Sequence, residues 1–155
     1  MPGLEDLYRE IILDHYRTPR NRGELPVPPA RHAEGHNPLC GDEISVFIDV
    51  AEHDGVSVVD DVKVTGQGCS ISQSSASMMS QAVKGKTVPE VRALVRKFKG
   101  MMSIETEGEP DGNGSDVPLG DLEALQGVVK FPVRIKCATL AWNTLTQALD
   151  APADA

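Results

Sequence analysis

Three cysteines and one aspartate are the residues of this chain best suited to hold a metal ion, and two of the four stand close together. Cys40 and Asp42 are two positions apart at the start of a segment that reads as extended. In extended backbone, residues two apart point to the same side, so both side chains are expected on one face. Gly41 between them allows the backbone to turn tightly. The pair is therefore a candidate for two ligands of a site that other residues must complete.

The other two cysteines each lie near the start of a predicted helix. Cys69 follows Gly68, where a strand is expected to pass into a helix, so its sulfur would lie near free amide groups at the positive end of a helix dipole. Cys137 is expected at the start or in the first turns of the last helix, after Arg134 and Lys136. These two cations are either ordinary exposed residues of a helix end or groups that moderate the negative charge of a thiolate site.

Three thiolates and one carboxylate form a donor set that suits zinc. Zinc accepts sulfur, nitrogen and oxygen ligands in tetrahedral geometry and has no redox chemistry of its own. The sequence therefore predicts one zinc ion per chain, held by Cys40, Asp42, Cys69 and Cys137. The alternative is that the three cysteines are small buried apolar side chains. The choice depends on whether the fold brings four residues from distant parts of the chain together.

Alternating apolar residues predict a small antiparallel sheet. Residues 43–50 and 56–64 both alternate, and the Asp-Gly dipeptide at 54–55 suits a primed hairpin turn between them. Because Asp60 falls on the apolar face of the second strand, either a β-bulge or the end of the sheet is expected near Asp60 and Asp61. Residues 31–36 are the candidate for a third antiparallel strand.

Helical periodicity predicts the helices that pack on this sheet. They are residues 4–16, a serine-rich helix that ends at Gly85, a helix that follows the capping box Thr87-Val88-Pro89-Glu90, a short helix around 119–125, and a last helix from about 133 to 149. Residues 18–30 contain four prolines and are expected to form an extended loop. Residues 103–118 are rich in Glu, Asp and Gly and are expected to form a solvated loop.

The composition excludes several classes of protein. With 155 residues, 40% of them hydrophobic and 25% charged, residues 1–150 are expected to form a single domain and residues 151–155 a frayed tail. A net charge of -8 disfavours nucleic acid and anionic membrane surfaces as partners. We find no signal peptide and no apolar run of membrane-spanning length. The odd number of cysteines argues against a disulfide framework, so reduced thiols and a cytoplasmic location are expected.

Several separated segments resemble the signature blocks of a known family. They are Asn37-Pro38-Leu39-Cys40-Gly41-Asp42, Gly66-Gln67-Gly68-Cys69-Ser70-Ile71-Ser72, Ser75-Ala76-Ser77 and Arg134-Ile135-Lys136-Cys137-Ala138-Thr139-Leu140-Ala141-Trp142, with a matching first helix and loop through Pro19-Arg20-Asn21. In this order they resemble the SufU branch of the NifU/IscU-like family over nearly the whole chain. The resemblance implies an α+β domain, with a small antiparallel sheet of about three strands and helices packed on it.

Two departures separate this chain from the IscU-type scaffolds of the same family. Lys136 stands where those scaffolds carry a histidine immediately before the last cysteine, and they lack most of the stretch that corresponds to residues 103–127. Both departures favour the SufU branch.

The resemblance also implies a function. Proteins of the SufU type accept sulfur from a cysteine desulfurase, a SufS-type enzyme that carries pyridoxal phosphate, and relay it to the SUF machinery for iron-sulfur cluster assembly. This chain is then a zinc-dependent sulfurtransferase that acts with the desulfurase. Cys40 is the predicted acceptor, because it lies on a glycine-flanked loop, whereas Cys69 and Cys137 adjoin helices. A zinc-bound thiolate is a weaker nucleophile, so docking would have to release Cys40.

Two other functions remain open at this point. In the first, the same ligands cradle an iron-sulfur cluster transiently and the protein is an assembly scaffold. In the second, zinc only stabilises the fold of a noncatalytic binding module. Colour separates the first from zinc binding, since a cluster absorbs visible light, and persulfide formation on a thiol would exclude the second.

Overall fold

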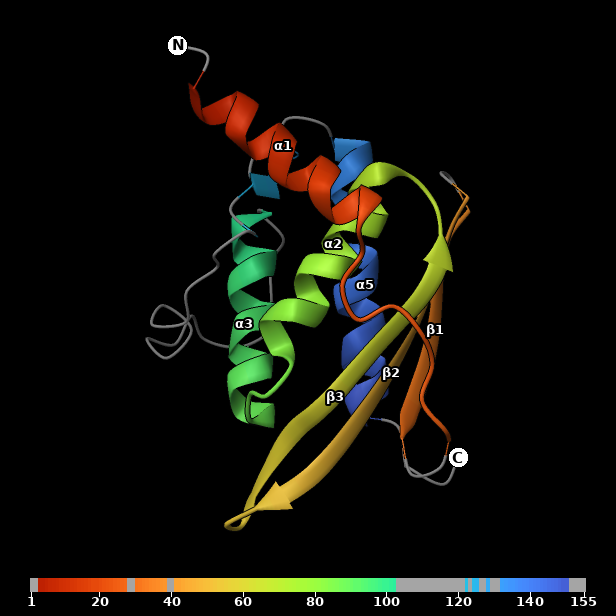
Figure 1. Cartoon of the computed structure of the whole chain (residues 1–155), viewed down its shortest axis with the longest axis vertical. Coiled ribbons are helices and arrows are strands. Elements are labelled where there is room, and N and C mark those ends of the chain that lie inside the picture. Colours follow the sequence, from red (N-terminus) through yellow and green to blue (C-terminus); the bar gives the residue numbers. More distant parts are fainter. Residues whose placement is uncertain are drawn as a thin grey trace.

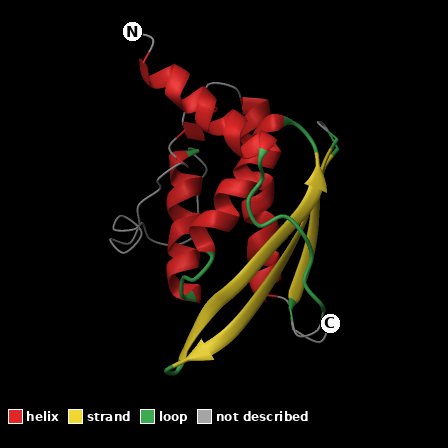
Figure 2. Ribbon diagram, viewed as in Figure 1, coloured by secondary structure: helices red, strands yellow, loops and turns green. Residues whose placement is uncertain are grey.

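A three-stranded antiparallel sheet and the helices that pack on it make up the computed structural model of this chain (Figures 1 and 2). The structure describes residues 3–27, 30–38, 41–102, 122, 124, 125, 128 and 132–150. The α+β architecture predicted from the sequence is confirmed, with the sheet as one layer and the helices as the other.

The strands follow one another in space as they do in the chain, in the order β1-β2-β3. Their bounds are Arg31–Asn37 for β1, Asp42–His53 for β2 and Val56–Gln67 for β3, and both pairs are antiparallel. The predicted third strand is therefore β1. Asp54 and Gly55, which join β2 to β3, have φ values of 55° and 81°, and positive values at both positions are typical of a type I′ turn.

The predicted bulge is present in the β2–β3 hairpin. Asp49 pairs with Asp61, whereas the next residue, Val50, pairs with Val59. Asp60 is therefore the extra residue, and its side chain is exposed. The bulge lets the hairpin keep its apolar face toward the helices without burying a carboxylate.

The four main helices are α1 (Gly3–Arg17), α2 (Ser70–Val83), α3 (Val88–Met101) and α5 (Pro132–Asp150). Helix α2 ends two residues before Gly85, whose φ is +85°, and Thr87 forms the predicted capping box with Glu90 at the start of α3. Between α3 and α5 the structure describes Met102, Leu122, Ala124, Leu125 and Val128, all of which are buried. The loop predicted at 103–118 lies outside the described residues, and so does most of the short helix predicted around 119–125.

Helices α2 and α5 pack on the sheet and on each other, α1 packs on α2, and α3 lies beside α5 (Figure 1). Phe98 of α3 stacks on Trp142 of α5, with ring centroids 4.5 Å apart. Buried apolar residues of the sheet and of α2, α3 and α5 form one cluster. The assignment of residues 1–150 to a single domain stays a prediction, and the tail 151–155 lies outside the described residues. Within the described part, we find no helix long and apolar enough to cross a membrane.

Buried serines of α2 connect this helix to its neighbours. The Ser75 hydroxyl donates to the Ala138 carbonyl oxygen at 2.6 Å and accepts a hydrogen bond from Trp142 Nε1 at 3.1 Å. Cys69 directly precedes α2 and Cys137 lies in α5, so Ser75 helps to set how these cysteines face each other.

A second buried serine joins α2 to the first helix and the loop after it. Ser77 Oγ lies 2.8 Å from Nδ1 of the fully buried His15 and accepts the backbone N–H of Arg20 at 2.9 Å. The buried His15 side chain therefore helps to hold α1 against α2.

Replacing Ser75 by alanine is expected to destabilise the protein by about 1–3 kcal/mol, because the buried Trp142 N–H and Ala138 carbonyl each lose a partner. Ser74→Ala is the matched control: Ser74 is equally buried, but among the described residues its hydroxyl bonds the Ile71 carbonyl of its own helix. That control should change stability by less than about 1 kcal/mol. Urea unfolding of both variants measures the difference, and equal losses would contradict the role given to Ser75.

Candidate metal centre

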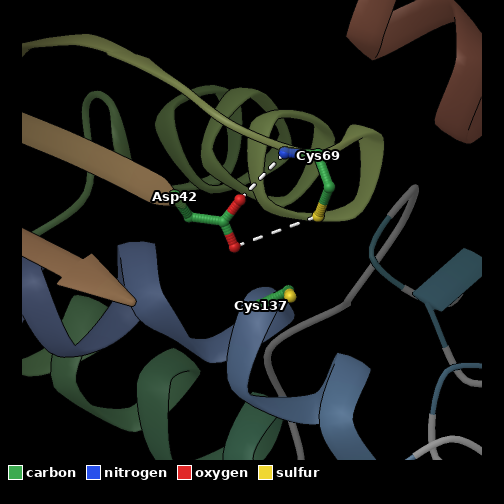
Figure 3. A group of neighbouring side chains, drawn as sticks. All are labelled: Asp42, Cys69 and Cys137. Atoms are coloured by element: carbon green, nitrogen blue, oxygen red, sulfur yellow. Dashed lines mark hydrogen bonds between the residues drawn. The ribbon is translucent and has the colours of Figure 1, made fainter. Parts of the chain in front are cut away.

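Asp42, Cys69 and Cys137 lie together although they come from three different elements (Figure 3). One ligand atom of each lies within 4.8 Å of the others. The strand β2, the N-terminus of α2 and the first turns of α5 thus meet at one point. Among the described residues this is the cluster of cysteine, histidine and acidic side chains close enough to hold a metal ion.

Asp42 is the first residue of β2 and is fully buried. It lies on the same face of the strand as Ile44 and Val46, as the alternation predicts. Its Oδ1 accepts the backbone N–H of Cys69 at 2.8 Å, and its Oδ2 lies 3.9 Å from Cys69 Sγ. A carboxylate without a partner at this depth would be costly, so the Cys69 amide stabilises it in place.

Cys69 is the N-cap residue of α2, as expected from its position after the last strand. Its backbone is extended, with φ of -71° and ψ of 167°, and its sulfur accepts the backbone N–H of Ser72 at 3.5 Å. The sulfur therefore lies at the N-terminus of α2, at the positive end of the helix dipole. The side chain is partly exposed.

Gly68 makes the close approach of Asp42 and Cys69 possible. A Cβ at this position would overlap Oδ1 of Asp42 and would lie 2.7 Å from Ser72 Oγ and 3.0 Å from Asp42 Cα. No side chain fits between the strand and the helix here, so glycine lets the carboxylate reach the Cys69 amide.

Cys137 is fully buried in α5. Its sulfur lies 3.9 Å from the Val133 carbonyl oxygen one turn earlier and 3.9 Å from Nδ2 of Asn37, the last residue of β1. Arg134 and Lys136, on the same helix, have exposed side chains. Sequence reasoning did not single out Asn37, although it stands in the block that contains Cys40 and Asp42.

The donor set and its spacing fit zinc. Ligands 2.0–2.3 Å from a tetrahedral zinc ion lie about 3.3–3.8 Å from one another. The three ligand atoms, at separations up to 4.8 Å, need to close by only about 1 Å to share one ion. Two sulfurs and one carboxylate oxygen also match the ligands that zinc prefers.

Cys40, the predicted fourth ligand and sulfur acceptor, lies outside the described residues. The flanking residues Pro38 and Gly41 are both exposed, and Gly41 has a φ of +69°. The chain thus enters and leaves this short segment at the surface, next to Asp42. The metal-binding roles of all four residues stay a prediction.

Comparison with known proteins gives a consistent family. The profile described as NifU-like N terminal domain matches residues 7–138. The chain is 45% identical over 147 residues to the zinc-dependent sulfurtransferase SufU of Bacillus subtilis, an alignment that covers 95% of this chain and 92% of the relative. It is 40% identical to the iron-sulfur cluster assembly scaffold protein IscU of Streptococcus pyogenes, over 98% of this chain and 88% of the relative.

Solved structures agree with the sequence comparison. A protein of Fervidobacterium islandicum, described as a candidate iron-sulfur cluster assembly scaffold for the SUF system, superposes with a TM-score of 0.73 at 33% identity and covers 95% of this chain and 99% of its own. The N-terminal part of a NifU-like protein from Brucella abortus gives a TM-score of 0.72 at 25% identity, with 94% of each chain covered.

Replacing Gly68 by alanine is expected to push the Asp42 carboxylate away from Cys69 and to weaken zinc binding by about 10-fold or more. The control is Gly85→Ala, which costs about 1–2 kcal/mol of backbone strain at φ +85° but places its Cβ in open space. Titration with a competing chelator measures zinc affinity in both variants. Equal zinc affinity in the two would show that the approach at Gly68 does not matter for the site.

Proposed function

Because this chain belongs to the family of NifU-like N-terminal domains, we propose that it serves iron-sulfur cluster assembly as a zinc-dependent acceptor and carrier of sulfur. The observation that carries this proposal is the convergence of Asp42, Cys69 and Cys137 from three elements. The name of the Bacillus relative, a zinc-dependent sulfurtransferase, supports the same reading.

In this proposal Asp42, Cys69 and Cys137 hold one zinc ion together with Cys40. The bound ion keeps its thiol ligands deprotonated and holds them in one geometry. Asp42 and Cys137 are fully buried and act as anchors of the site. Cys69 contributes the end of α2, where the helix dipole favours negative charge.

Cys40 is the proposed acceptor of the sulfur atom. Its thiolate attacks the outer sulfur of a cysteine persulfide on the desulfurase, a new S–S bond forms, and the old S–S bond breaks to leave the enzyme's thiolate. No external oxidant or reductant is needed, because the sulfane sulfur moves with its oxidation state unchanged. The exposure of Pro38 and Gly41 on either side allows a partner to approach this edge.

The proposed partners are a cysteine desulfurase of the SufS type, which supplies the persulfide, and downstream components of the SUF machinery, which receive the sulfur. The similarity to the Fervidobacterium protein, which is assigned to the SUF system, supports this choice. The cytoplasmic location expected from the sequence also stays a prediction.

A cluster scaffold is the second candidate function, and the Streptococcus relative, named a scaffold, favours it. The same ligand atoms serve both functions. Lys136, exposed beside Cys137, offers an ammonium group that binds iron poorly, so the site has no added nitrogen ligand at that position. This difference supports zinc over a cluster.

Metal analysis of the anaerobically purified protein separates the two functions. One zinc per chain and no visible absorbance are expected, because the ligand set suits a metal without redox chemistry. Asp42→Ala should lose most of the zinc, whereas Asp49→Ala, in the same strand but outside the cluster, should keep it. Iron and sulfide in equal amounts, with a brown colour, would instead establish the scaffold.

Replacing Cys40 by alanine tests the acceptor role. With a desulfurase and cysteine, the wild-type protein should increase sulfide release and carry a persulfide on Cys40, which a turnover assay and mass spectrometry detect. In Cys40→Ala the rate of sulfur transfer should be lower by at least about 100-fold, since no other thiolate takes the sulfur in its place. Sulfur transfer at the wild-type rate in that variant would exclude Cys40 as acceptor.

A further inference from the structure

We propose that Asn37 is a positioning residue of the metal centre, whose side-chain amide donates a hydrogen bond to the sulfur of Cys137 when that sulfur binds the metal. The inference rests on the proposed function, because it concerns the same ligand cluster. It adds a residue to which neither the sequence motif nor the comparisons assign a role.

The register of the sheet places Asn37 beside the site. Asn37 ends β1 and pairs directly with Asp42 at the start of β2. Residues directly opposite each other in an antiparallel pair point to the same face of the sheet, so the amide and the carboxylate emerge side by side toward α5. Asn37 is 8% exposed, and its Nδ2 lies 3.9 Å from Cys137 Sγ.

The contact has the chemistry of a donor to a thiolate. Sulfur is larger than oxygen, so N–H···S contacts are longer than N–H···O bonds. A neutral thiol accepts hydrogen bonds weakly, but an ionised group accepts them about twice as strongly. With Nδ2 toward the sulfur, the amide can donate to a metal-bound thiolate, whereas the carbonyl oxygen would repel it.

Each of the three clustered ligands then has a donor. Asp42 Oδ1 accepts the Cys69 backbone N–H at 2.8 Å, and Cys69 Sγ accepts the Ser72 backbone N–H at 3.5 Å. These two donors belong to the backbone at the start of α2. Cys137 lies inside α5, beyond its first turn, and its sulfur meets the Asn37 side chain, a donor from another element.

The charge of the site explains why such donors matter. Two thiolates and one carboxylate carry three negative charges against the two positive charges of zinc, and a third thiolate, that of Cys40, adds one more. Hydrogen bonds to the ligands spread this charge and fix their orientation. Because the Asn37 donor is a side chain, a single substitution removes it without altering the backbone.

The test compares Asn37→Leu and Asn37→Asp with the wild-type protein and with a matched control. Leucine removes the amide without adding charge, and aspartate keeps the shape but places a carboxylate beside the sulfur. Thr144→Val is the control: Thr144 is buried on α5, close to Gly35 of β1, and its hydroxyl bonds the Leu140 carbonyl of its own helix. The control therefore alters the same helix–strand interface away from the cluster.

Three measurements are made on each protein: zinc affinity against a competing chelator, the sulfur-to-cobalt charge-transfer absorption of the Co²⁺ form, and thermal unfolding of the metal-free form. Asn37→Leu is expected to raise the zinc Kd by about 10-fold and to shift the charge-transfer band. Asn37→Asp is expected to raise the Kd further, because it adds negative charge. Thr144→Val should stay within about 2-fold of the wild-type Kd with an unchanged band, whatever its effect on unfolding.

The outcomes separate the inference from the function on which it rests. A wild-type protein that binds zinc, together with Asn37 variants that match its Kd and its cobalt spectrum, would overturn the role of Asn37 and leave the metal centre intact. A Kd that rises as much in Thr144→Val as in Asn37→Leu would also overturn it, since the effect would then be a general loss of packing. A wild-type protein without affinity for zinc or cobalt would overturn both proposals.

Discussion

The hydrogen bond from the Cys69 backbone N–H to the Asp42 carboxylate, 2.8 Å long, connects the start of the second strand to the start of the second helix. Asp42 has no exposed surface, so its carboxylate depends on donors from the protein. The Cys69 amide is one of those that a helix N-terminus leaves without an intrahelical partner. The buried carboxylate therefore gains a donor, and the Cys69 amide gains an acceptor. The absence of a side chain at Gly68 permits the contact. This contact places two candidate ligands together where the strand and the helix begin.

The third candidate ligand depends on how α5 packs. Cys137 reaches the cluster because α5 lies against both the sheet and α2, and the buried Ser75 hydroxyl links α2 to α5 through two hydrogen bonds. The ring of the same Trp142 stacks on Phe98 and so connects α5 to α3 as well. The site is therefore the point where separate parts of one apolar core converge, so its geometry is as well defined as the core.

Burial differs among the candidate ligands and the residues near Cys40. Asp42 and Cys137 are closed off from solvent, Cys69 is partly exposed, and Pro38 and Gly41 are exposed. Two sulfur atoms and one carboxylate this close together form a donor set that suits a divalent cation.

Most of the fold was predictable, because its signals are local. Alternation over a few residues marked the hairpin, the aspartate on the apolar face of the second strand marked the bulge at Asp60, and Thr87 with Glu90 marked the start of α3. Each of these features is decided by neighbours within a few positions. The types of the candidate ligands were also visible in the sequence, and the family resemblance, now supported by the comparisons, gave them a context.

The meeting of those ligands was decided only by the tertiary structure, since Asp42 and Cys69 are 27 positions apart and Asn37 and Cys137 are 100 apart. Local periodicity carries no information about such distances, because they depend on the register of β1 against β2 and on the packing of α5 across the sheet. The sequence by itself therefore determined which atoms were available for binding a metal. The three-dimensional packing of the core determined that they face one another, and that Asn37, which no spacing rule singles out, lies against Cys137.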